Sequence, residues 1–172
     1  MTLRPERNPF TRTLVRWQSF FPAGRVEADN GEARAARISV RTEVGAVLAR
    51  GSAEIPVTQL FLTGGDTTVR GYSYRSIGAR TQNNQLYGGR YMGVASVEWQ
   101  RPITYRGNMT DWENTLFVDA GAVADRAGDL DPRVGVGTGV RWRSPVGPLQ
   151  ADLAWGVQSK QLRLHLRLGF TF

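Results

Sequence analysis

The last strand candidate of the chain constrains its fold more than any other feature. From Leu162 to Phe172 every second residue is large and apolar, and the residues between them are cationic, polar or small. Side chains of a β-strand point alternately to opposite faces, so this segment predicts a strand with one apolar and one cationic face. Its length matches the roughly 9–11 residues with which a tilted strand crosses a bilayer.

The same alternation occurs in earlier segments. In Gly147–Val157 the apolar Leu153 and Trp155 lie on the face opposite Asp152, and in Thr115–Val123 the parity separates Leu116 from Asp119. Further strand candidates are Thr11–Phe20 (the weakest), Ile38–Leu48, Tyr91–Gln100 and Val134–Arg143. No long helical pattern interrupts the second half, so the sequence predicts an all-β fold, an antiparallel meander of long strands.

Short polar segments connect most of these candidates. Tight links are expected at Ser144–Gly147 and Gln158–Gln161, and polar turns at Asn108–Asp111 and Ala127–Pro132. One connection, Ala49–Gly89, is far longer than the typical ~4–6 residues. It contains several aromatic residues, which favour an ordered loop: Phe61, Tyr72, Tyr74 and Tyr87.

Composition leaves a soluble sandwich and a membrane barrel open. The 172 residues suffice for one domain, with 41% hydrophobic residues and a mean hydropathy of −0.34. No apolar run reaches the length of a transmembrane helix. The bilayer-length strands favour the membrane barrel, as do Trp99, Trp142 and Trp155, which fall near strand ends on the apolar face.

Charge and residue usage exclude several functions. The net charge is +7, but the arginines are scattered singly, so nucleic acid is not an expected partner. The chain has no cysteine and one histidine, His165, which leaves no catalytic residues, metal site or cofactor to expect. We interpret His165 as a polar wall residue.

The glycines Gly135, Gly137 and Gly139 resemble a phosphate loop only superficially. They lie within a strand candidate, and no helix follows, so nucleotide binding is not expected. Small residues here would instead leave space inside a barrel for the long loop.

Three motifs occur in order along the chain. The long loop contains Gly64-Gly65 and then Val69-Arg70-Gly71-Tyr72; Phe117-Val118-Asp119-Ala120-Gly121 follows, and Gly139–Leu149 looks like a hairpin before the final strands. Together they resemble the outer-membrane assembly and secretion barrels, the family of BamA, TamA and the two-partner secretion transporters. The resemblance covers roughly residues 38–172, and Asp152-Leu153-Ala154 leans toward the TamA branch.

The resemblance implies a 16-stranded bacterial outer-membrane barrel, preceded by periplasmic domains. This chain would supply about seven of those strands, too few to close such a barrel. We therefore expect residues 1–172 to be a partial, C-terminal barrel domain, with 1–35 weakly assigned and 49–89 a loop folded into the lumen. The start, Met1–Phe10, lacks the apolar stretch of the signal peptide that an exported barrel needs, so either the sequence is partial or the export interpretation is wrong.

In this family the loop arginine meets an acidic residue of the barrel wall. Strand parity places Asp119 and Glu98 on the inner face, so Arg70 is expected to pair with Asp119, with Glu98 as the alternative partner. Three glycines of the motif, Gly64, Gly65 and Gly71, are expected to permit tight turns and a close approach of the loop backbone to the wall. Val69 and Tyr72 complete the motif.

The function implied by the resemblance is insertion, assembly or translocation of outer-membrane or secreted β-proteins, without covalent chemistry. A substrate strand would add to an exposed edge of the barrel seam. One side of that seam, and an assembly signal, would lie in the last strand, at Leu166, Leu168, Phe170 and Phe172. The expected partners are the lipid bilayer and unfolded outer-membrane proteins, and a partner subunit spanning the periplasm is also allowed.

Two alternatives from other classes remain. A passive, porin-like channel would share the alternation but would not need the Arg70 loop. A barrel enzyme would need a base for its nucleophile, and His165 is the only histidine.

The terminal Phe172 resembles the targeting signal by which outer-membrane barrels are themselves recognised. We expect deletion of Phe172, or Leu168→Asp, to lower the amount of the full-length protein assembled in the outer membrane, measured as its heat-modifiable folded fraction over time. If Phe172 is only an interfacial anchor, the deletion costs modest stability and leaves the assembly kinetics normal.

Overall fold

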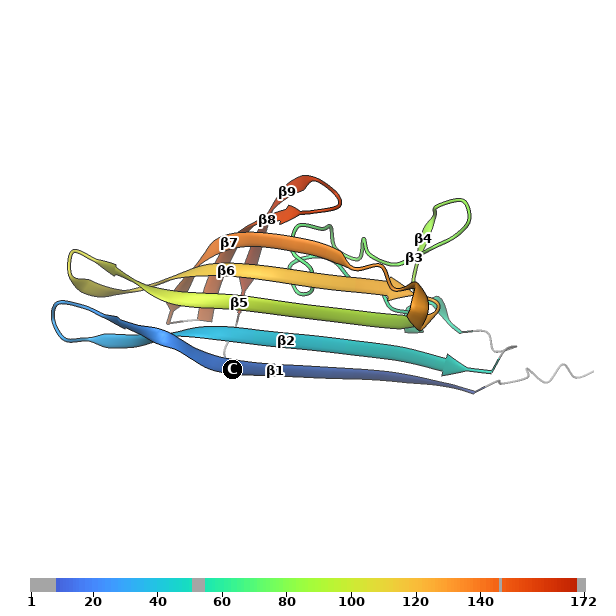
Figure 1. The fold of residues 1–172 in the computed structure, drawn as a ribbon, viewed down its shortest axis with the longest axis horizontal. Helices are drawn as coiled ribbons and strands as arrows, with labels where there is room; N and C mark the ends of the chain where they lie inside the picture. Colours follow the sequence, from blue (N-terminus) through green and yellow to red (C-terminus); the bar gives the residue numbers. More distant parts are fainter. Residues whose placement is uncertain (1–8, 51–54, 146, 170–172) are drawn as a thin grey trace, which may run out of the picture.

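The strands form one large curved sheet and one small hairpin. The computed structural model describes residues 9–50, 55–145 and 147–169. The large sheet is seven-stranded in the order β1-β2-β5-β6-β7-β8-β9, and β3 pairs with β4 (Figure 1). The elements are β1 Phe10–Glu27, β2 Ala33–Ala49, the 3₁₀ turn η1 Val57–Gln59, β3 Ala79–Arg80, β4 Leu86–Tyr87, β5 Tyr91–Tyr105, β6 Asn108–Ala124, the 3₁₀ turn η2 Ala127–Asp129, β7 Arg133–Ser144, β8 Gly147–Gly156 and β9 Gln161–Leu168.

All neighbouring strands of the large sheet are antiparallel, so the predicted all-β meander is confirmed. In the described part of the chain, no helix has the length and apolar character needed to cross a membrane. Several strands are longer than the sequence predicted: β1 has 18 residues, β2 and β6 have 17 each, and β5 has 15. Apolar alternation marks only the part of a strand that faces lipid, so polar extensions beyond it were missed.

One predicted turn is wrong. The chain reverses between β5 and β6 at Arg106-Gly107, whose φ angles are 50° and 77°, and Asn108 already belongs to β6. Two successive positive φ angles are typical of a two-residue hairpin turn. The sequence places the turn at the polar cluster Asn108–Asp111 because this first part of β6 lacks the apolar alternation of the rest of the strand. The strand predicted for Leu162–Phe172 ends at Leu168, and Phe170 and Phe172 lie outside the described residues.

The two faces of the sheet differ as the parity predicted. On β6, Leu116 and Val118 are about half exposed, whereas Asp119 is fully buried. On β9, Leu164 and Leu166 are 66% and 70% exposed. A large exposed apolar face is stable in lipid and unfavourable in water.

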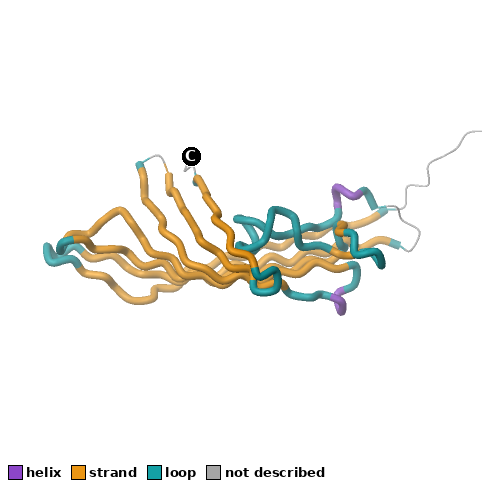
Figure 2. The backbone as a smooth tube through the Cα atoms, turned by 90° about the horizontal axis from the view of Figure 1, so that it is seen from above, coloured by secondary structure: helices purple, strands orange, loops and turns teal. Residues whose placement is uncertain are grey.

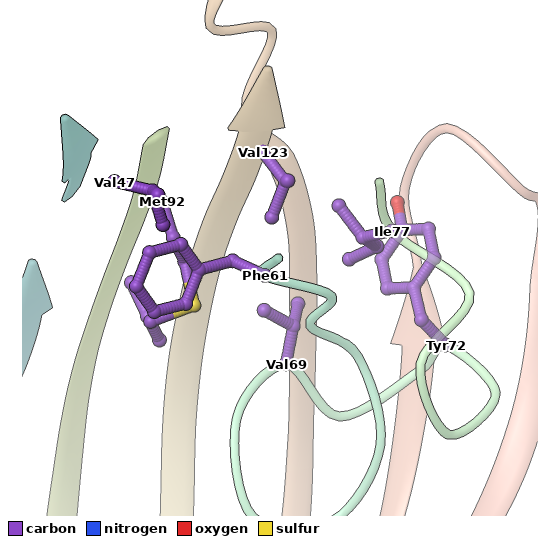
Figure 3. Packing of buried hydrophobic residues seen from close by; sticks show 8 residues of the cluster. Val47, Phe61, Val69, Tyr72, Ile77, Met92 and Val123 are labelled. Carbon is purple, nitrogen blue, oxygen red and sulfur yellow. The ribbon is translucent and has the colours of Figure 1, made fainter. Parts of the chain in front are cut away.

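The long connection between β2 and β5 lies against the other, concave face. In Figures 1 and 2 the sheet bends strongly, with β8 and β9 crossing the direction of β1 and β2, and the loop lies within the bend. A hydrophobic cluster forms where loop and sheet meet (Figure 3). Its loop members are Phe61, Val69, Tyr72 and Ile77, and its strand members are Val47, Met92, Val94 and Val123. The inner face therefore carries an apolar patch, which the prediction of apolar residues on the outer face alone did not include.

The open sheet and its apolar outer face together predict how the chain behaves in isolation. Among the described residues β1 and β9 each pair on one side only, and unpaired edges promote aggregation. Expressed alone, the 172-residue chain should aggregate in plain buffer and require detergent to stay monodisperse. The check is size-exclusion chromatography with thermal melting; a cooperative, monomeric melt without detergent would contradict the membrane assignment.

Candidate functional site: a loop arginine anchored inside the sheet

Glycines shape the tip of the long loop. Gly64, Gly65 and Gly71 have φ angles of +107°, +106° and +90°, a region that other residues rarely adopt. The turn is closed by hydrogen bonds that the Gly64 N–H donates to Thr68 Oγ1 (2.8 Å) and the Gly65 N–H donates to the Val69 carbonyl (3.1 Å). The turn thus brings the following residue, Arg70, onto the sheet.

Two residues of the sheet lack side chains where the loop backbone crosses it, Gly135 and Gly156. Asp119, Gly135 and Gly156 occupy one row across β6, β7 and β8. A methyl group on Gly135 would collide with the Arg70 carbonyl oxygen, and one on Gly71 would lie 2.7 Å from the Gly156 nitrogen. Neither glycine can therefore be enlarged without moving the loop.

The expectation that Gly137 and Gly139 make space for the loop is not met. A methyl group on Gly137 would meet Leu153 and Phe117, and one on Gly139 would meet Asp152. These two glycines make room for side chains of the wall because the wall itself is crowded at this level. Of the three strand glycines, only Gly135 lies against the loop.

Arg70 contacts three carboxylates from three strands. Its Nε and Nη2 donate to Asp119 Oδ2 (2.7 Å) and Oδ1 (3.0 Å), a bidentate pair, and its backbone N–H also donates to Oδ2 (3.1 Å). Its Nη1 donates to Glu98 Oε2 (2.5 Å) and to Asp152 Oδ2 (2.9 Å). The guanidinium lies over the Phe117 ring, 3.4 Å from the centroid. Arg70, Asp119, Glu98 and Asp152 are called the Arg70 cluster below.

Two predictions about this contact need revision. Glu98 was expected as an alternative to Asp119, but Arg70 binds both at once because its planar fork presents donors in several directions. Asp152 was missed as a partner, although parity had already placed it on the inner face. Three inward carboxylates on nearby strands were the signal that could have identified the full cluster.

The cluster is buried, and neighbouring polar groups satisfy its oxygens. Arg70 is 3% exposed and Asp119 is fully buried. Ser96 Oγ donates to Asp119 Oδ1 (2.6 Å), Gln100 Nε2 donates to Glu98 Oε1 (2.5 Å), and Gln150 Nε2 donates to Asp152 Oδ2 (3.0 Å). A buried ionic group is tolerated when it is paired and hydrogen-bonded in this way.

Burial on its own lowers the pKa of the Arg70 guanidinium. The hydrogen bonds to Asp119, with the charges of Asp119 and Glu98, outweigh burial and raise the pKa above its ordinary value. Arg70 is therefore a permanent cation, and the anchor cannot be released by losing a proton from this side chain.

The rest of the motif fixes the loop to the hydrophobic cluster, to the connection between β8 and β9, and to β9. Val69 is fully buried in the hydrophobic cluster, and Tyr72 Oη donates to Gln158 Oε1 (2.5 Å). The Gly71 N–H donates to His165 Nε2 (3.0 Å), so this polar wall residue also holds the loop. Leu166 and Leu168 do not join the cluster, because their side chains lie on the apolar outer face.

The described residues contain no group of side chains arranged to hold a metal ion. The site consists of a buried ion-pair network and a loop backbone in close contact with glycines of the sheet. This is the chemistry of positioning rather than of bond making.

A meander of long strands with an apolar outer face, a largely polar inner face and a loop anchored on that inner face is typical of a segment of an outer-membrane-type β-barrel. The chain belongs to the Omp85 superfamily, since the model of the Omp85 superfamily domain matches residues 2–172. It is therefore a bacterial outer-membrane protein, and its family consists of assembly factors and transporters rather than enzymes, as predicted.

One sequence relative and one solved structure with a similar fold are both BamA proteins. The outer membrane protein assembly factor BamA of Nitratidesulfovibrio vulgaris (strain Hildenborough) is 31% identical over 114 residues, covering 64% of this chain and 14% of the relative. The crystal structure of BamA from Haemophilus ducreyi lacking POTRA domains 1–3 has the same fold, with a TM-score of 0.69 and 20% identity over 96% of this chain and 36% of that one. The chain thus spans a minor part of the length of both proteins.

The close contact between the loop backbone and Gly135 can be tested by adding a single methyl group. Gly135→Ala should displace the Arg70 backbone, and overpacking of this kind costs about 1–3 kcal/mol. Gly93→Ala is the matched control, because a methyl group there would meet no atom within 4 Å. We expect faster trypsin cleavage of the loop, at Arg75 and Arg80, and a lower melting temperature in detergent for Gly135→Ala only. Equal behaviour of the two variants would contradict the close approach.

Proposed function

We propose that the protein containing this chain inserts or assembles β-barrel proteins in the outer membrane, without covalent chemistry. The Arg70 cluster is the observation that carries this proposal. It anchors a long loop by one cation to β5, β6 and β8 at once. A passive diffusion channel needs an open lumen, and nothing in that function requires such an anchor.

The same loop is tied to β9, the strand expected at the seam. Besides His165, Arg167 of β9 donates a hydrogen bond to the Asp66 carbonyl. A loop held in this way would keep β9 in place while a substrate strand pairs with its free edge.

The partners follow from this role. The substrates would be unfolded outer-membrane proteins, the surroundings a lipid bilayer, and a periplasm-spanning subunit would be an additional partner. The name of the Nitratidesulfovibrio vulgaris relative, an outer membrane protein assembly factor, supports this class of function. The lean toward the TamA branch rests on Asp152-Leu153-Ala154, and in this chain Asp152 has a structural task of its own, binding Arg70.

A double-mutant cycle on Arg70 and Asp119 tests the proposal in the full-length protein. Removing one partner of a fully buried pair costs about 3–5 kcal/mol, and a hydrated lumen lowers that cost. Arg70→Gln and Asp119→Asn should each reduce the amount of a model barrel protein folded into liposomes, and the double variant should be less impaired than the sum of the two. A charge swap is a poorer test, because an acidic residue in place of Arg70 would face Glu98 and Asp152.

Arg126→Gln is the control, since this exposed arginine lies in the β6–β7 connection, away from the cluster. Liposome swelling is measured in parallel. Variants that fold the substrate normally but admit solutes faster would overturn the assembly function and favour the passive channel.

A further inference from the structure

A cavity of about 290 Å³ lies on the concave face beside the Arg70 cluster. It is lined by side chains from β1, β2, β5, β7, β8 and β9, and by Arg70 itself. Three of its arginines belong to no part of the cluster: Arg41 on β2, Arg141 on β7 and Arg167 on β9. We call these the lumenal arginines.

The lumenal arginines form no ion pair with any carboxylate of the described residues. Arg41 donates to the carbonyls of Thr67 and Thr68, and Arg167 donates to that of Asp66. Arg141 makes one long contact, 3.4 Å from its Nη1 to Gln100 Oε1. The Nε atoms of Arg141 and Arg167 are buried and lack a hydrogen-bond partner within the described ranges. Each guanidinium therefore retains donors that are not used.

The cavity has an excess of positive charge. Its lining contains four arginines and one carboxylate, Glu98. When Asp119 and Asp152 of the adjacent cluster are included, arginines still outnumber carboxylates by four to three. Half-buried guanidinium groups with free donors are unfavourable unless an anion is bound to them, because burial weakens their hydration.

The position of the cavity selects the kind of anion. It lies on the face opposite the exposed leucines and valines, so lipid headgroups on the outer surface do not reach it. Phe20, 59% exposed, adds an apolar wall, and Gln100 and Gln150 add amide groups. Carboxylates fit the guanidinium fork, and an apolar wall with amides suits a polypeptide.

We propose that the lumenal arginines bind carboxylate side chains of an acidic polypeptide segment inside the barrel. This deepens the proposed function, on which it rests, by giving the substrate a chemical class. The occupant would meet the same guanidinium groups that hold residues 66–68 of the loop.

The test uses the full-length protein in detergent and a fluorescent hexaglutamate peptide, with hexalysine as the opposite charge. Arg141→Gln is the informative variant, because Arg141 holds neither the loop nor the cluster. Loss of a charge-assisted hydrogen bond should weaken hexaglutamate binding about tenfold, measured by fluorescence anisotropy. Arg126→Gln removes the same charge at a distance and should change binding less than about twofold. Arg141→Lys, which keeps the charge but not the fork, should lie between them.

The proposal is supported if Arg141→Gln weakens hexaglutamate binding about tenfold, Arg141→Lys weakens it less and Arg126→Gln changes it less than about twofold. Absence of binding, or equal loss in Arg141→Gln and Arg126→Gln, overturns it and shows that the lumenal arginines are neutralised elsewhere in the protein or act only through net charge. Liposome assembly of a barrel substrate is measured on the same samples. Assembly without hexaglutamate binding overturns this inference alone, whereas binding without assembly overturns the proposed function alone.

Discussion

The buried charge of Arg70 is the constraint on which the rest of the inner face depends. A guanidinium withdrawn from water must find anions, so Glu98, Asp119 and Asp152 have to reach one point from three strands. The sheet register allows this because the three residues lie on the inner face in adjacent rows. The carboxylates in turn accept hydrogen bonds from Ser96, Gln100 and Gln150, so a single loop residue accounts for the polar side chains around it.

The Arg70 guanidinium reaches its carboxylates only because two wall residues under the loop backbone lack side chains. Gly135 and Gly156 stand in the same row as Asp119, and the loop backbone passes directly over both. The hydrophobic cluster that contains Phe61 and Val69 packs the rest of the loop against the inner face of the sheet. Ion pairing fixes where the loop tip lies, and hydrophobic packing removes the remaining freedom of the loop body.

Strand parity was enough to predict the meander, the outer face and the inward direction of Asp119 and Glu98. It failed where a strand leaves the lipid, as at Asn108, since a polar strand end and a turn have the same composition. It also failed for contacts made by three strands at once. The pattern of one strand says which way Asp152 points, but only the register between strands shows that Asp152 and Asp119 reach the same guanidinium. The apolar patch on the inner face was missed for a related reason: Met92 and Val94 are buried by the loop that precedes β5, not by lipid.

The distribution of charge around the loop tip gives the inner face two distinct regions. In the Arg70 cluster three carboxylates surround one cation, so each of the three guanidinium nitrogens donates to a carboxylate and the loop is fixed. Beside it, Arg41 and Arg167 bind backbone carbonyl oxygens of residues 66–68, which carry only partial charges. A hydrogen bond to a neutral carbonyl is weaker than one to a carboxylate, so this second region exchanges its partners more readily than the first. The loop is thus held firmly at Arg70 and less firmly at residues 66–68, and any anion that enters the lumen meets the less firmly held side.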